Sequence, residues 1–319
     1  MPPLLLPLAA VAIAPVMLYF GADRLVTGSV QAGRAARIRP MVIGLTLVAF
    51  ATSAPELVVG VVASLQGVPK VAVGNVIGAN VANVGLIIGS ASLVAPMAMA
   101  RSTWRKEIPI TLAVQVILFV LCLGGTVARW EGGVLILLLA AFLTYMILTR
   151  RDTDLPDATR EVRRPAASTV RIVLRIVGGV VLLAGGGYLL VRGATRVAEA
   201  AGLSHLAIGA SLVAFLTTVP ELATSLIAAR RGEGDIAVGN AVGSILFNSA
   251  LVLGTAALIR PLPVAAETAL VKVPIMIAML LGLMASARSG FRVFRWEGAL
   301  LLAGYLGFTV YVVLAGATG

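Results

Sequence analysis

Two glutamates stand within long apolar stretches of the chain, where an ionisable side chain is unexpected. Glu56 and Glu221 each follow a proline and precede a leucine, in the same three-residue motif. Ionisable groups at membrane depth are costly, and by default they mark a functional position. A protonated glutamate that only packs is the alternative, and recurrence of the motif in both halves disfavours it. The pair is therefore the candidate centre for chemistry.

The prolines before these glutamates change the helix in which each glutamate lies. Pro55 has no N–H, so it leaves the carbonyl of Ala51 without its helical donor, and Pro220 does the same to the carbonyl of Leu216. Free carbonyls at membrane depth are tolerated where they line a cavity. A simple helix kink is the alternative, although a kink does not require an adjacent glutamate.

Other polar residues recur at helical spacing near the glutamates. Thr52 and Thr217 each lie four residues before a glutamate, so each threonine shares a helix face with that glutamate. Polar stripes with a spacing of four residues follow in both halves: Asn75, Ala79 and Asn83, then Asn240, Ser244 and Asn248. The stripes are expected to face inward, toward the glutamates. Interhelical hydrogen bonding is the alternative role for such asparagines.

The candidate ligands are all oxygen atoms, from carboxylates, hydroxyls, amides and freed carbonyls. Hard cations such as Ca²⁺ take about 6–8 oxygen ligands. The same cage, rearranged, could hold Na⁺ or protons, which is what an exchanger requires. Glycines four residues apart, Gly74 with Gly78 and Gly239 with Gly243, predict the close helix contact that brings these polar faces together.

An internal repeat relates the two halves of the chain. Residues 43–89 align without gaps with residues 208–254, and 20 of the 47 pairs are identical. The repeat includes both glutamate motifs and both asparagine stripes. Five predicted spans, an odd number, precede the midpoint, so the second copy enters the membrane from the opposite side. Inverted repeats of this kind place a substrate site near the midplane, between the halves.

The elements that must position these residues are membrane-spanning helices. Of the 319 residues, 59% are hydrophobic and 12% are charged, whereas a soluble domain averages about 45–50% and about 25%. A spanning helix needs roughly 20 apolar residues. Ten such segments are predicted, over residues 4–22, 41–65, 71–95, 108–128, 133–149, 172–191, 206–229, 236–259, 269–287 and 297–315.

The predicted fold class is an all-α polytopic membrane protein with ten transmembrane helices as two inverted five-helix repeats. The repeats are expected over residues 1–149 and 172–319, with a cytoplasmic linker over 150–171. With the N-terminus outside, the inside loops carry 18 Lys and Arg residues and the outside loops carry 6. This split predicts that both termini lie outside. Minimal loops rich in Ala, Gly and Arg favour a prokaryotic plasma membrane.

Composition argues against several other functions. The net charge is +11, but aromatic residues form only 5% of the chain and do not alternate with the basic ones, which disfavours nucleic-acid binding. A single histidine, His205, and a single cysteine, Cys122, exclude sites built from several of either. No nucleophile–base arrangement indicates an enzyme. The expected partners are small cations and the lipid bilayer, with no cofactor and with the chain functional as a monomer.

These motifs resemble those of a known family, the sodium/calcium exchanger branch of the calcium/cation antiporter superfamily. Its two alpha-repeats are similar to GLTLVAFATSAPELVVG with GNVIGANVANVG, and to GASLVAFLTTVPELATS with GNAVGSILFNSALVLG. The resemblance implies transport by alternating access, in which the first and sixth helices slide against the rest.

The resemblance also implies a set of site residues. Ca²⁺ in the family binds between the motif glutamates and the carbonyls of neighbouring threonines. The matching glutamates here are Glu56 and Glu221, and the matching threonines are Thr52 and Thr217. Sodium sites in the family use flanking hydroxyls and carbonyls, and the matching positions are Ala49, Ser53, Ala214, Thr218 and Ser244. Asn83 and Asn248 complete the expected metal ligands.

Three positions depart from the family pattern. Ala79 stands where serine is usual, Ile245 where asparagine is usual, and Asn248 where many members have aspartate. We predict a secondary antiporter that exchanges Ca²⁺ for Na⁺. The departures keep open an H⁺-coupled exchanger or one for another divalent cation. A cation channel is the weaker alternative, because no four-fold filter motif is present.

Overall fold

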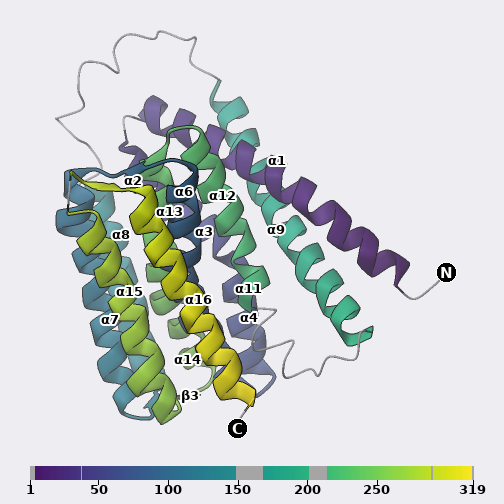
Figure 1. Cartoon of the computed structure of the whole chain (residues 1–319), viewed down its shortest axis with the longest axis vertical. Coiled ribbons are helices and arrows are strands. Elements are labelled where there is room, and N and C mark those ends of the chain that lie inside the picture. Colours follow the sequence, from purple (N-terminus) through teal and green to yellow (C-terminus); the bar gives the residue numbers. More distant parts are fainter. Residues whose placement is uncertain (1–3, 37, 149–167, 201–213, 289, 318–319) are drawn as a thin grey trace.

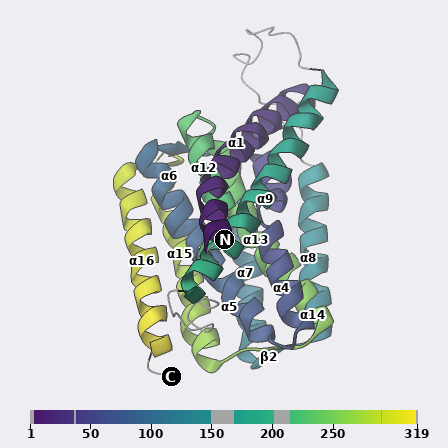
Figure 2. The ribbon, with the colours of Figure 1, turned by 90° about the vertical axis from the view of Figure 1, so that its right-hand side faces the viewer.

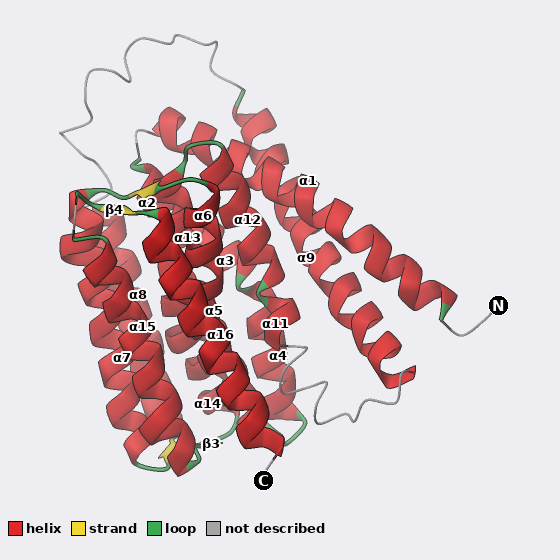
Figure 3. Ribbon diagram, in the orientation of Figure 1, coloured by secondary structure: helices red, strands yellow, loops and turns green. Residues whose placement is uncertain are grey.

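The computed structural model describes residues 4–36, 38–148, 168–200, 214–288 and 290–317, and these are almost entirely helical (Figure 3). Within this part of the chain, eight helices are long and apolar enough to cross a membrane. A pair of helices bent by 46° forms a ninth candidate span. The predicted span 206–229 begins among residues 201–213, outside the described residues, and only its later part is seen.

The elements of the two halves follow the same order as far as they are described. The first half contains α1 (Leu5–Ala36), α2 (Pro40–Ile43), the π-helical η1 (Gly44–Val48), α3 (Ala49–Thr52), α4 (Ala54–Leu65), α5 (Pro69–Ala82), η2 (Asn83–Ile88), α6 (Gly89–Val94), β1 (Met97–Ala98), η3 (Thr103–Glu107), α7 (Ile108–Leu123), β2 (Thr126–Val127) and α8 (Arg129–Leu148). The second half contains α9 (Thr169–Ala200), α11 (Ala214–Thr217), α12 (Val219–Arg230), α13 (Gly234–Leu246), η6 (Phe247–Val252), α14 (Leu253–Ile259), β3 (Leu262–Pro263), η7 (Thr268–Lys272), α15 (Val273–Ser286), β4 (Arg292–Val293) and α16 (Arg295–Ala317).

The repeat extends well beyond the aligned motifs. The π-helical η3 and the helix α7 begin 165 residues before η7 and α15. α8 and α16 both begin with Arg-Trp-Glu-Gly. In each, the glutamate accepts a hydrogen bond from a backbone N–H three residues earlier, Ala128 to Glu131 and Phe294 to Glu297, both at 2.7 Å. The same hydrogen bond at the start of both helices indicates that the whole five-helix unit is duplicated.

Two short strand pairs join the halves at opposite ends of the molecule (Figure 3). β1 pairs antiparallel with β4, and β2 pairs antiparallel with β3. Each pair thus takes one strand from each half. In the order of elements β3 is the counterpart of β1, and β4 is the counterpart of β2. Each strand thus pairs with the counterpart of the other strand of its own half, as expected when the second half is inverted.

The centre of the molecule is formed by two continuous spans, one from each half, and each includes a π-helical segment. The spans Pro69–Val94 and Gly234–Ile259 are each 78% buried over their most apolar window, against 22–39% for the other six unbroken spans that are described. α7, α8 and α15 lie on the side away from the tilted pair α1 and α9 (Figure 1), and α16 forms the edge of the molecule opposite α8 (Figure 2). The repeat segments that carry the asparagine stripes therefore form the core.

The tilted pair α1 and α9 is held together by close backbone contact. A Cβ atom on Gly21 would lie 2.8 Å from the backbone N of Leu183, and one on Gly179 would lie 2.7 Å from the backbone N of Leu25. Both helices run past the predicted ends at residues 22 and 191, to Ala36 and Ala200. Apolarity alone underestimates their length, because this mutual packing supports the polar turns as well.

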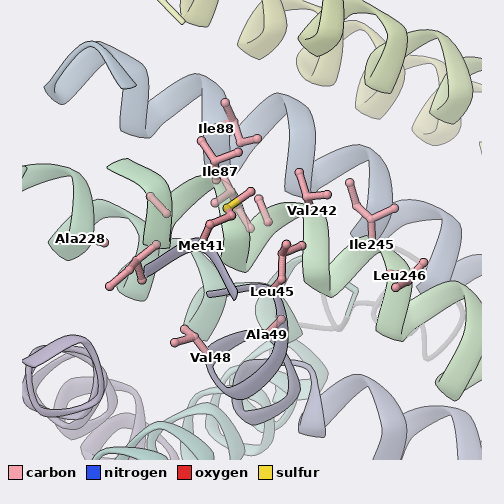
Figure 4. Close-up of a cluster of buried hydrophobic side chains, with 14 of the residues drawn as sticks. Met41, Leu45, Val48, Ala49, Ile87, Ile88, Ala228, Val242, Ile245 and Leu246 are labelled. Atoms are coloured by element: carbon pink, nitrogen blue, oxygen red, sulfur yellow. The ribbon is translucent and has the colours of Figure 1, made fainter. Parts of the chain in front are cut away.

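A second close contact places the glutamate-bearing segment against the centre. A Cβ atom on Gly243 of α13 would lie 2.6 Å from the carbonyl O of Leu45, and one on Gly239 would lie 2.9 Å from the carbonyl O of Met41. Figure 4 shows the apolar side chains around this crossing, including Met41, Leu45 and Ala49. The close approach predicted for Gly239 and Gly243 is confirmed. The segment equivalent to η1 in the second half lies outside the described residues.

Candidate functional site

Each glutamate lies in the first turn of a helix that restarts after a break. Ser53 separates α3 from α4 and has φ −80° and ψ 5°, and Thr218 separates α11 from α12 with φ −83° and ψ −2°. The following proline is the second residue of the new helix, where its missing N–H costs nothing. The positive end of a helix dipole favours a carboxylate in that turn. The motif thus produces a break in the helix and places a glutamate in the first turn after it.

The predicted polar site residues are gathered inside the protein. Both glutamates are completely buried. Buried with them are Thr52, Ser53, Asn83, Thr217, Thr218, Ser244 and Asn248, together with Ala49 and the two further asparagines Asn75 and Asn240. Ala214 is the first residue of α11, and its side chain lies outside what the structure describes.

Hydrogen bonds at the break connect one half to the other. The Ser53 hydroxyl donates to Oε1 of Glu221 at 3.3 Å. The Thr52 hydroxyl donates to Oδ1 of Asn240 at 3.0 Å, and the Thr217 hydroxyl donates to Oδ1 of Asn75 at 3.5 Å. The threonines therefore reach across the molecule, and each meets the equivalent asparagine of the opposite half.

Asn240 connects several helices at once. Its Nδ2 donates to Oγ of Ser225 at 3.0 Å and to the carbonyl O of Glu221 at 3.3 Å, while its Oδ1 accepts from Thr52. These contacts match the interhelical role that the sequence left open for this asparagine and for Asn75. The sequence patterns did not indicate Ser225, because its counterpart in the first half is Gly60 and the serine therefore occurs in the second copy of the repeat only.

Several buried polar atoms of the site have no hydrogen-bond partner among the described residues. They are both carboxylate oxygens of Glu56, Oε2 of Glu221, Oδ1 of Asn83, Oγ of Ser244, and both Oδ1 and Nδ2 of Asn248. Glu221 reaches the break that precedes Glu56, because its Oε1 accepts the hydrogen bond from Ser53. Buried polar groups without partners are rare in native proteins and call for an explanation such as a bound ion. Oxygen atoms dominate this set, as a hard cation requires.

The departures from the family pattern have local structural consequences. The carbonyl O of Ala79 accepts a hydrogen bond from Nδ2 of Asn83 at 2.9 Å, which leaves Oδ1 of Asn83 as the unpaired atom. Ile245 packs in the apolar cluster of Figure 4. Asn248 supplies an amide rather than a carboxylate. Within the described residues, no group of three or more His, Cys, Asp or Glu side chains could hold a metal.

Both halves of the chain match one known protein family. The family model described as sodium/calcium exchanger protein matches residues 6–148 and 171–314, which is nearly the whole chain. The chain belongs to the sodium/calcium exchanger family. Members of this family are membrane transporters and not enzymes.

Three similar proteins each match more than nine tenths of the chain. The sodium/calcium exchanger MaX1 of Methanosarcina acetivorans is 31% identical over 335 residues, covering 92% of this chain and 95% of the relative. CaxA of Alkalimonas amylolytica, provisionally an antiporter, is 36% identical over 313 residues, covering 93% and 96%. A structure of the sodium-calcium exchanger NCX_Mj, soaked with Na⁺ and Ca²⁺, superposes with a TM-score of 0.84 at 29% identity over 95% of this chain and 97% of that one.

One buried cluster next to the site was not indicated by the sequence patterns. Nδ2 of Asn80 donates to Oγ of Ser249 at 2.7 Å, and the Ser249 hydroxyl donates to Oε1 of Gln115 at 2.8 Å. All three side chains are fully buried. Their residues lie on three different elements, and the repeat places apolar residues opposite them, so neither spacing nor symmetry indicated the cluster.

Proposed function

We propose that this member of the sodium/calcium exchanger family exchanges Ca²⁺ for Na⁺ by alternating access. One observation carries the proposal: two completely buried glutamates, Glu56 and Glu221, come from opposite halves that are joined by the Ser53–Glu221 bond, and three of their four carboxylate oxygens are unpaired among the described residues. Two adjacent buried carboxylates need a compensating positive charge. Neither glutamate forms an ion pair with a basic residue that the structure describes, so a transported cation is the natural source.

The proposed ligands follow from which atoms remain open. Ca²⁺ is bound by the two glutamates and by the backbone carbonyls of Thr52 and Thr217, whose hydroxyls are already engaged. Asn83 and Asn248 add amide oxygens. The proposed Na⁺ sites use the remaining positions of the break and of α13, namely Ala49, Ser53, Ala214, Thr218 and Ser244. Sharing both glutamates forces the two ions to compete, which couples their movements.

Proton coupling is the second candidate, and Asn248 favours it. A neutral amide at this position leaves two carboxylates in the site, so two protons suffice to neutralise it between cations. After Ca²⁺ leaves, the carboxylate oxygens of Glu56 and Glu221 would bind Na⁺ in a sodium-coupled exchanger and protons in a proton-coupled one. A different divalent cation would use the same ligands.

The experiment measures ⁴⁵Ca uptake into proteoliposomes that contain the purified protein. An outward Na⁺ gradient and an outward H⁺ gradient are imposed in parallel, with gradient-free vesicles as the control. Uptake driven by Na⁺ supports the proposal. Uptake driven by H⁺ alone overturns sodium coupling and supports the second candidate. The absence of uptake under both gradients overturns calcium exchange.

The proposed setting is a prokaryotic plasma membrane, with the chain active as a monomer. The bias of basic residues supports a topology with both termini outside and the linker over residues 150–171 in the cytoplasm. The five-helix units over residues 1–149 and 172–319 are proposed as the two structural domains. Each contributes one glutamate, so neither contains a complete site.

A further inference from the structure

The buried cluster of Asn80, Ser249 and Gln115 exists on only one side of the pseudo-symmetric molecule. Addition of 165 to Asn80 and Gln115 gives Ile245 and Leu280, and subtraction of 165 from Ser249 gives Val84. These three counterparts are buried in one apolar cluster: Val84, Ile245 and Leu280. One side of the repeat therefore holds a hydrogen-bonded polar trio where the other side holds an apolar trio of similar size.

The polar trio joins elements from both halves. Asn80 lies on α5, Ser249 on η6 and Gln115 on α7, and the two hydrogen bonds of 2.7 and 2.8 Å connect them in series. Nδ2 of Asn80 also lies 3.5 Å from Sδ of Met276 on α15. Four elements thus meet at one buried point. A hydrogen-bonded connection of this kind fixes relative helix position more strictly than apolar contact does, because it is directional.

The trio lies directly beside two proposed cation ligands. Ser249 follows Asn248 in η6, and Asn80 is one helical turn before Asn83. Both amide atoms of Asn248 are unpaired among the described residues, so no hydrogen bond to its own amide fixes the orientation of this side chain. The hydroxyl of the next residue, Ser249, is in turn hydrogen-bonded to Gln115. Groups that hydrogen-bond behind a ligand orient it and raise its affinity for a metal.

We propose that Gln115 is a positioning residue for the cation site, acting through Ser249 to hold Asn248 and through Asn80 to hold the helix that carries Asn83. Gln115 lies outside both alpha-repeat motifs, and the inference rests on the cation site of the proposed function. The trio fixes η6 against α5, whereas the apolar trio opposite leaves the equivalent crossing without a directional bond.

The test compares two variants that differ in whether a polar group is left unsatisfied. Gln115→Leu introduces the residue found at the counterpart position, and it leaves the Ser249 hydroxyl without its acceptor. The triple variant Asn80→Ile, Gln115→Leu, Ser249→Val reproduces the whole apolar trio, so it leaves no orphaned group. Leu280→Met on α15 is the matched control. Direct ⁴⁵Ca binding to detergent-purified protein, the KM and maximum rate of uptake, and the melting temperature are measured for each.

We expect both variants to weaken Ca²⁺ binding and to raise KM by about threefold to tenfold, the worth of one hydrogen bond, with little change in maximum rate. The melting temperature should fall for Gln115→Leu and recover in the triple variant. A purely structural role predicts instead that Ca²⁺ affinity recovers together with the melting temperature, and that result would overturn the proposal. Unchanged affinity in both variants overturns it equally. Wild-type protein that binds no Ca²⁺ overturns the proposed function itself, and the inference with it.

Discussion

The polar atoms of the site fall into two groups with different tasks. The hydroxyls of Thr52 and Thr217 are engaged in bonds between the halves, and Asn75 and Asn240 accept those bonds. The oxygens of Glu56 remain unpaired among the described residues. Atoms of the first group hold the helices at the correct separation, and atoms of the second group are free for an ion. Residue type alone did not distinguish the two groups, because asparagine occurs in both.

Removal of either glutamate charge should abolish exchange. Glu56→Gln and Glu221→Gln keep the shape of the side chain but remove half of the negative charge of the site, so ⁴⁵Ca uptake should fall to background. The control is Glu267→Gln, because Glu267 is at the surface and contacts Tyr311 and Lys272. The melting temperature checks folding. Normal uptake by either glutamine variant of the site would show that the cation binds elsewhere.

Restoration of a carboxylate at position 248 should shift the balance between ions. Asn248→Asp adds a negative charge beside two others, and a site of higher charge favours divalent over monovalent cations. The inhibition of ⁴⁵Ca binding by Na⁺ should therefore require more Na⁺ than in the wild type. Asn75→Asp, at an asparagine that is bonded across the halves, is the comparison. Unchanged competition in Asn248→Asp would place this side chain outside the site.

At the scale of elements, the sequence predicted which segments cross the membrane better than where they end. The repeat and the Pro-Glu motifs indicated a disturbed helix at each glutamate. The structure has a bend of 46° at the break before Glu56 and a break at Thr218 before Glu221. α1 is 32 residues long, although its apolar run indicated only residues 4–22. Asp23 interrupts that run but pairs with Arg231, so the helix continues through a charged turn. A hydropathy pattern shows the charge of Asp23 but not its ion pair with Arg231, so it predicts too early an end for α1.

The contact between α1 and α9 gives a prediction with a built-in control. Gly178 and Gly179 are adjacent on α9, but a Cβ atom on Gly179 would lie 2.7 Å from the Leu25 backbone N, whereas one on Gly178 would meet only the Arg24 side chain at 4.0 Å. Gly179→Ala should destabilise the protein by about 1–3 kcal/mol through overpacking. Gly178→Ala should be neutral or slightly stabilising, since alanine favours helix.

Thermal unfolding in detergent measures both glycine variants. A lower melting temperature for Gly179→Ala than for Gly178→Ala supports the close contact. Equal melting temperatures would contradict it, because the two substitutions are chemically identical and differ only in the face of α9 that they occupy.

At the scale of the whole molecule, the sequence predicted the two inverted halves. It did not predict the polar clusters that occur in only one copy of the repeat. Symmetry between residues 43–89 and 208–254 indicates what the halves share. It carries no information about positions where they differ, such as Gln115 opposite Leu280. The Asn80–Ser249–Gln115 cluster is one such difference, and it needs three elements in their folded places before its members meet.

Topology can be tested at two exposed positions that lie on opposite sides of the predicted membrane. The only cysteine, Cys122, is buried, and its replacement by alanine gives a background for single-cysteine variants. Ser168→Cys should be protected from a membrane-impermeant maleimide in intact cells, and Thr126→Cys should be labelled. Both side chains are exposed. The reverse labelling pattern would show that the charge bias had been read in the wrong direction.

The hydrogen bonds that cross between the halves have a consequence for how such a protein could arise. Thr52 meets Asn240, Ser53 meets Glu221, and Thr217 meets Asn75, so every one of these bonds has one partner on each five-helix unit. A half-length ancestor would have carried one glutamate and only half of each bond. It could have worked only as a pair of copies inserted in opposite directions in the same membrane. Gene fusion would then have fixed one copy in each direction, and only afterwards could serine, asparagine and glutamine on one side diverge from their apolar counterparts.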